Sequence, residues 1–225
     1  MIISVHQPQY LPWLGYFNKI AKSDMFVFLD NVQYKKREFQ NRNKIRTKDG
    51  GIWLTVPVVT KGKFEQKISE VEIDNTESWA KSHYKSICMA YSKTKYFSEH
   101  NVFFEEVYSR DWNRLCDLNL KIIFYLLKNF KIDIPIYYES KLDIDGTKTD
   151  RIIKICKKLN ADTYLSGIGA RDYLDEEALK NNKLQLVYQN FTYPEYPQAY
   201  DGFEPYMSAI DLLFNCGPES YKYIL

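Results

Sequence analysis

Residues 1–17, MIISVHQPQYLPWLGYF, decide how this chain begins to fold. Residues 1–5 form a short apolar strand pattern, His6 stands at its end, and a Pro-punctuated turn then leads into a helical pattern. A buried strand that ends in this way places a reactive side chain at the carboxyl edge of an α/β sheet. His6 is one of only three His in the chain. We therefore favour a functional His6 over a structural one bonded to a turn carbonyl.

The pattern continues with a helix over 12–22 and a second strand over 25–29. Pro12 suits the first turn of that helix, where a missing N–H is harmless. Such a strand–helix–strand unit implies parallel strands with a right-handed crossover. Asp30 then ends the second strand on the same edge as His6, where it either orients His6 or caps the following loop.

The rest of the chain alternates between strand and helix patterns, so we predict a single α/β domain over 1–225 with a mainly helical insertion around 77–130. The expected sheet is partly parallel, opens with the strand–helix–strand unit and is accompanied by a hairpin. The further elements are a hairpin over 43–58, a short strand at 71–73, helices at 77–91, 101–107, 111–130, 149–159 (with Thr149 as N-cap), 175–181 and 207–214, and strands at 135–138, 163–165 and 184–189.

Composition excludes several classes of protein. The net charge of +2 argues against nucleic acid as a partner. The four Cys are widely spaced without a C-x-x-C pair, so no metal site is predicted. No targeting segment or apolar run long enough to span a membrane is present, so a cytoplasmic location with reduced thiols is expected. The 19 Tyr suit a site that stacks and hydrogen-bonds a sugar or a base.

A basic stretch follows the second strand, with seven Lys or Arg against Glu38 alone over 35–48. Arginines interleaved with amides suit a phosphorylated ligand, because Arg binds phosphate in a bidentate way and amides read hydroxyls. A solvated basic loop is the equally weighted alternative. The predicted ligand contacts are Gln33, Tyr34, Arg37, Asn41, Arg42, Asn43 and Arg46.

Two further polar groups lie near predicted strand ends or in the tail. Ser166 and Gly167 follow a strand and open a glycine-containing loop that could cradle phosphate on backbone N–H groups, or simply turn. We expect a ligand cleft where His6, Asn43 and at least one of Ser166, Gln198 or Asp211 meet. The remaining candidates for substrate contact are Tyr10, Ser208 and Asn215.

Taken together, these residues resemble the WbqC-like family over nearly the whole chain. The resemblance is carried by the N-terminal block and by several shorter motifs. These are Val5–Phe17, Asp24, Phe28-Leu29-Asp30, Gln33-Tyr34, Asn41-Arg42-Asn43, Tyr164–Gly167, Tyr173-Leu174, Tyr196, Gln198 and Ser208–Asn215. The N-terminal order is also similar to nucleotidyltransferase and pantoate-ligase folds. Their turn carries a second His where this chain has Gly15-Tyr16, which argues against adenylyl transfer.

The resemblance implies a bacterial protein of surface-polysaccharide (O-antigen, lipopolysaccharide) biosynthesis. Its expected reaction is acylation or aminoacylation of the amine of a nucleotide-linked deoxyamino sugar. The donor is expected to be a thioester on coenzyme A or an acyl carrier protein, with no covalently bound cofactor. His6 is expected to act as general base, and Gln7 or Asn43 to steady the oxyanion. The alternatives are an ATP-dependent acyl or aminoacyl ligase and a non-catalytic nucleotide-sugar binding protein.

Overall fold

The sheet at the centre of the molecule is parallel throughout. The computed structural model describes all 225 residues, and the five strands of the sheet lie in the order β5-β2-β1-β6-β7. Every neighbouring pair is parallel. The α/β prediction is therefore confirmed, with the antiparallel strands confined to a separate hairpin. The sheet strands are β1 (Ile2–His6), β2 (Met25–Phe28), β5 (Ile136–Tyr138), β6 (Thr163–Ser166) and β7 (Gln185–Tyr188).

The opening strand–helix–strand unit is formed as predicted, because β1 and β2 pair in parallel from Ile3–Met25 to His6–Phe28. The intervening helix α1 (Leu14–Ala21) starts later than the position of Pro12 suggests. The cause lies in the tail. The carbonyl of Pro12 accepts a hydrogen bond from Ala209 N, which keeps this segment extended beside the tail.

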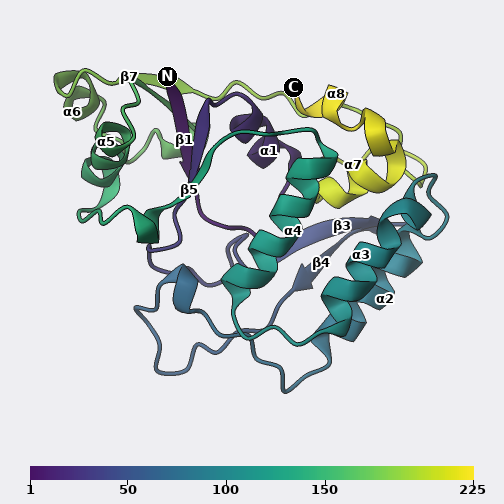
Figure 1. Cartoon of the computed structure of the whole chain (residues 1–225). Helices are drawn as coiled ribbons and strands as arrows, with labels where there is room; N and C mark the ends of the chain where they lie inside the picture. Colours follow the sequence, from purple (N-terminus) through teal and green to yellow (C-terminus); the bar gives the residue numbers. More distant parts are fainter.

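The two faces of the sheet bury different helices (Figure 1). Ile3 and Val5 of β1 point to the face covered by α5 (Lys148–Lys158) and α6 (Glu176–Asn181). Phe26 and Phe28 of β2 point to the opposite face, where α1 lies. Because successive residues of a strand alternate between faces, Ser4 and His6 share the face of α1. The Oγ of Ser23, just after α1, donates to Ser4 Oγ at 2.7 Å.

A hairpin and three helices pack beyond α1. The hairpin consists of β3 (Arg42–Thr47) and β4 (Gly50–Thr55), and the helices are α2 (Trp79–Tyr91), α3 (Phe97–Ser109) and α4 (Leu115–Asn129). The expected strand at 71–73 is wrong. These residues make only isolated bridges, Glu72 with Arg114 and Val58 with Ile73, after the short 3-10 helix η1 (Ile68–Glu70).

The last third completes the fold with short helical segments. These are η2 (Glu139–Lys141), η3 (Ile168–Ala170), α7 (Ala209–Cys216), η4 (Gly217–Glu219) and α8 (Tyr221–Ile224). Gly217 ends α7 with a positive φ of 49°, a conformation that glycine adopts without strain. The expected N-cap at Thr149 is wrong. Thr147 occupies that position, and the Thr149 hydroxyl accepts from Asp175 N at 2.9 Å, so it links α5 to the start of α6.

We expect Gly15→Ala to lower the free energy of unfolding by about 1–3 kcal/mol, because the added methyl would overlap the Trp13 indole. Chemical denaturation measures the change. Gly169→Ala is the matched control, since its methyl meets no atom within 4 Å. Adding Trp13→Ala to Gly15→Ala should remove the overlap. An unaltered stability of Gly15→Ala would contradict the packing described.

Candidate functional site

The strand order reverses between β1 and β6, the position where open α/β sheets form a crevice at their carboxyl edge. From β1, the chain adds β2 and β5 on one side and then β6 and β7 on the other, so the order reverses at this point. Pairing between β1 and β6 ends at Ser4 and Leu165, whereas pairing between β1 and β2 continues to His6. Ligands of open α/β sheets bind at the carboxyl edge where the order reverses. Val5, His6, Ser166 and the following loops therefore form the candidate site.

His6 lies partly buried at the mouth of this crevice. Its ring meets Tyr16 edge-on at 5.0 Å between centroids, and its Nδ1 lies 3.3 Å from the carbonyl oxygen of Gln7. The Tyr16 hydroxyl donates to the same carbonyl at 3.2 Å. Burial, and then the positive charge of Lys19, hold the pKa of His6 well below its ordinary value. His6 is therefore neutral at pH 7 and, with Nδ1–H donated to Gln7, presents Nε2 as an acceptor.

The end of β6 provides the other wall. Ser166 is buried and its hydroxyl donates to the Gly167 carbonyl at 3.3 Å. Gly167 and Gly169 face open space, since a Cβ added at either would meet no atom within 4 Å. Gln189, just after β7, donates to Gly15 O and to Asn18 Oδ1, both at 2.8 Å, and so ties this side of the sheet to α1.

Asp30 does not contact His6. Its two carboxylate oxygens accept from Ser140 N at 2.9 Å and from Ser140 Oγ at 2.5 Å. Its backbone carbonyl accepts from Ser69 N. Asp30 therefore caps the loop after β2 and does not orient His6. Through Ser140 it also links this loop to the one after β5.

The basic segment is spread over several partners instead of converging on one point. Arg37 is exposed, and the Arg42 guanidinium lies 4.5 Å from the centre of the Trp53 ring. Arg46 is buried, pairs with Glu204 at 2.7 Å and donates to Asp201 O at 3.0 Å. Because Glu204 already neutralises Arg46, the three arginines do not make a joint phosphate site in this structure.

The amides of the same segment bond the protein backbone. Asn41 donates to Val56 O at 2.8 Å, and Asn43, fully buried, donates to Leu11 O at 2.6 Å. Gln33 donates to Phe64 O at 2.9 Å, while the Tyr34 side chain is buried. Burial without access to solvent removes Asn43 from a cleft shared with His6.

The tail residues form a closed network around Asp211. This fully buried carboxylate accepts from Tyr196 at 2.8 Å and from Gln198 at 2.9 Å. Asn215 donates to the Asp211 carbonyl, and Ser208 caps α7 by accepting from Ile210 N. None of these residues hydrogen-bonds to His6. Tyr10 is likewise in the core, where its hydroxyl meets His83 Nδ1 at 2.8 Å and the Tyr108 hydroxyl at 2.5 Å.

Lys19 is the residue of the crevice that sequence reasoning missed. It lies on α1, is only 4% exposed, and its Nζ donates to Val5 O at 3.0 Å. Burial lowers its pKa to about 7. A lysine beside Ile20 in a short amphipathic helix ordinarily extends to solvent. The sequence therefore gave only a weak indication that Lys19 is buried, namely a cation in a helix with few polar positions.

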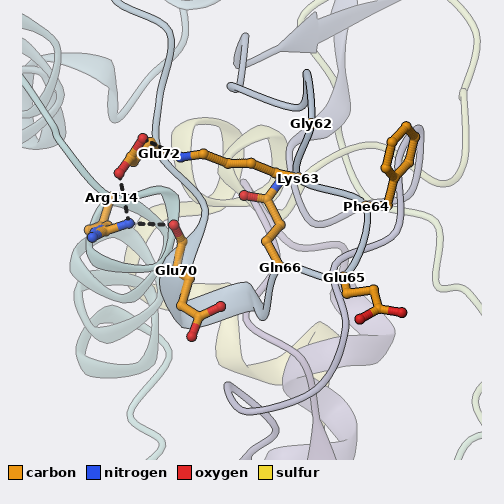
Figure 2. Close-up of a pocket in the computed structure, with 8 residues that line it drawn as sticks. All are labelled: Gly62, Lys63, Phe64, Glu65, Gln66, Glu70, Glu72 and Arg114. Atoms are coloured by element: carbon orange, nitrogen blue, oxygen red, sulfur yellow. Dashed lines mark hydrogen bonds and ion pairs between the residues drawn. The ribbon is translucent and has the colours of Figure 1, made fainter.

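A separate open cavity of about 690 Å³ lies beside the loop after β2, on the 62–72 segment and Arg114 (Figure 2). Figure 2 shows Lys63 and Arg114 both reaching Glu72, at 2.6 and 3.4 Å. The segment is attached to the end of β2 by hydrogen bonds such as Ile68 N to Val32 O. His6 does not line this cavity, and its cations are already paired. This cavity is therefore separate from the candidate site around His6.

The three buried cysteines are not activated as nucleophiles. Burial raises the pKa of Cys116 and of Cys156 to about 12 and that of Cys216 to about 11. Nucleophilic attack requires the thiolate, which such a shift suppresses at neutral pH. No three His, Cys, Asp or Glu side chains gather in a way that could hold a metal ion.

The strand order and the crevice define a doubly wound α/β protein whose candidate site lies at the reversal point. The chain belongs to the WbqC-like protein family, which it matches over residues 7–223. It is also similar to "Uncharacterized protein Rv1507c" of Mycobacterium tuberculosis (strain ATCC 25618 / H37Rv), with 35% identity over 224 residues that cover 99% of this chain and 96% of that protein. No solved structure matches the chain significantly. None of its helices is both long and apolar enough to cross a membrane.

We expect iodoacetamide to modify native protein at Cys88, which is partly exposed on α2, and to leave the three buried thiols unmodified. The reason is that burial both blocks access and suppresses the thiolate. Mass spectrometry of peptides after a short exposure measures each site. In unfolded protein all four should react. Rapid native labelling of Cys116 would contradict the description given.

We also expect His6 to stay neutral when the pH is lowered through 6.5. Its pKa is lower in the folded than in the unfolded chain, so the unfolded state binds more protons below about pH 6.5 and folding stability is lost as the pH falls through that window. NMR of the imidazole carbons measures the pKa, and His6→Asn should reduce the loss of stability between pH 7.5 and pH 5. The two other His also have lowered pKa values, so the comparison must be with wild type at each pH.

Proposed function

We propose that the protein acylates or aminoacylates the amine of a nucleotide-linked deoxyamino sugar, with His6 as the general base. The observation that carries this proposal is a neutral imidazole at the reversal point of a doubly wound sheet. A base at this position must be unprotonated at the working pH and within reach of a bound substrate. His6 is only partly buried, so it also meets the second requirement, access to a bound substrate.

In the proposed reaction, each side of the crevice has its own role. The substrate amine attacks the carbonyl carbon of a thioester as His6 Nε2 takes its proton. The resulting oxyanion is stabilised by the Gln7 side chain or by backbone N–H groups of the loop from Gly167, which replace the buried Asn43 in this role. The carbon–sulfur bond then breaks, and the departing thiolate takes the proton from His6.

Direct transfer is favoured over an acyl-enzyme. The thiols of Cys116, Cys156 and Cys216 are held in their protonated form by burial. No Ser or Thr hydroxyl hydrogen-bonds to His6, as an activated hydroxyl nucleophile would. The donor, a thioester of coenzyme A or of an acyl carrier protein, would therefore be present together with the sugar.

The resemblance to the WbqC-like family supports a proposal for the setting of the reaction. We infer a role in bacterial surface-polysaccharide biosynthesis, in the cytoplasm, on a sugar linked to a nucleotide diphosphate. The second candidate is an ATP-dependent ligase that forms an acyl-adenylate. It is favoured by the strand order, because a mononucleotide binds at the reversal point of doubly wound sheets. ATP consumption with release of AMP would distinguish it from thioester transfer.

We expect His6→Ala to lower turnover by roughly 10²- to 10⁴-fold, the usual effect of removing a general base. The measurement is a mass-spectrometry screen of nucleotide-linked amino sugars with thioester donors, with and without ATP. Lys22→Ala, an exposed change on the same side of the sheet, is the control and should retain full turnover. Undiminished turnover of His6→Ala on a substrate that the wild type converts would falsify the assignment.

A further inference from the structure

Lys19 is a buried cation without a partner of opposite charge. All ion pairs within 4.0 Å in the molecule join other residues. Its ammonium group has three donors, and Val5 O accepts one of them at 3.0 Å. Burying an unpaired charge is costly, and the lowering of its pKa to about 7 expresses that cost.

The direction of the side chain follows from the shape of the sheet. In a continuously paired sheet, the carbonyl of Val5 would be bonded by the neighbouring strand. Here pairing between β1 and β6 stops at Ser4 and Leu165, so this carbonyl is free and Lys19 binds it. The four-carbon stem could have extended to solvent, as that of Lys22, the C-cap residue of this helix, does. Lys19 instead points its charge into the crevice.

The groups that face Lys19 carry no negative charge. From β1 these are Val5 O and the imidazole of His6, whose pKa the lysine charge lowers. From its own helix, Tyr16 lies one turn away, and burial raises the pKa of its phenol. The loop after Ser166 follows the strand that would otherwise bond the Val5 carbonyl, and a Cβ added at Gly167 or Gly169 meets no atom within 4 Å. Lys19 therefore has no neutralising partner at the point where β1 and β6 separate.

We propose that Lys19 is the anchor of an oxyanion site in the crevice between β1 and β6, which takes a phosphate group of the substrate. An anion would use the two free ammonium donors in charge-assisted hydrogen bonds, which are stronger than neutral ones. This inference rests on the proposed function for the identity of the ligand, since it moves the sugar-nucleotide phosphate from the 33–46 segment to the crevice beside His6.

Inorganic pyrophosphate, titrated by isothermal calorimetry at constant ionic strength, tests the site. Lys19→Met keeps the length of the side chain and removes its charge, and we expect it to weaken binding by roughly 10- to 100-fold, the effect of losing a hydrogen bond to a charged group. Lys22→Met is the matched control at the C-cap of the same helix and should bind like wild type. Equal affinity of Lys19→Met and wild type, or no binding by wild type at millimolar concentration, would overturn the proposal.

A second measurement needs no variant. With lysine labelled at Cε, NMR follows the pKa of the Lys19 amine, which we expect to rise from about 7 when pyrophosphate binds. An unchanged pKa at saturation would place the anion elsewhere. Acetate in a parallel titration separates a phosphate site from one for any carboxylate: binding as tight as that of pyrophosphate contradicts the phosphate assignment. Because none of these experiments measures turnover, anion binding and acyl transfer can fail independently.

Discussion

The carboxyl ends of β1 and β6 separate, and the candidate site depends on that separation. β1 leads to α1 on one face of the sheet, while β6 leads to η3 and α6 on the other. Two parallel strands whose chains leave toward opposite faces cannot remain paired to their ends. The carbonyl of Val5 consequently loses its strand partner, Lys19 replaces that partner, and His6 lies beside the resulting gap.

Lys19 and His6 influence each other through this gap. Both side chains have a lower pKa than in water. Burial lowers the pKa of Lys19, and burial together with the charge of Lys19 lowers the pKa of His6. The effect on His6 suits a general base only in part, because a lowered pKa keeps the imidazole free but also makes it a weaker base. An anion bound to Lys19 would offset the positive charge and raise the basicity of His6. Substrate binding and base strength would then be coupled by electrostatics.

Most of the other polar side chains stabilise the fold. Asn119 illustrates this: fully buried on α4, it donates to Gln40 O at 2.8 Å and so holds the segment before β3 against the helix. Asn43 has a comparable role toward the N-terminal turn, because it donates to Leu11 O at 2.6 Å. A buried backbone carbonyl left without a donor is costly, which is why these amides are retained in the interior. Polar residues in motifs are therefore not a reliable guide to ligand contacts in this molecule.

The sequence by itself determined most of the elements and the parallel opening unit. Apolar periodicity and turn residues such as Gly217 are local signals, and they act over a few residues of chain. It also indicated that His6 lies at a strand end. Only the tertiary structure decided which polar side chains are already bound to other groups of the protein and which are available to a ligand. Glu204 neutralises Arg46, and Ser140 holds Asp30, through contacts between residues more than a hundred positions apart. The inward direction of Lys19 likewise depends on the early end of the pairing between β1 and β6. No local sequence pattern indicates where two strands that are distant in the sequence separate.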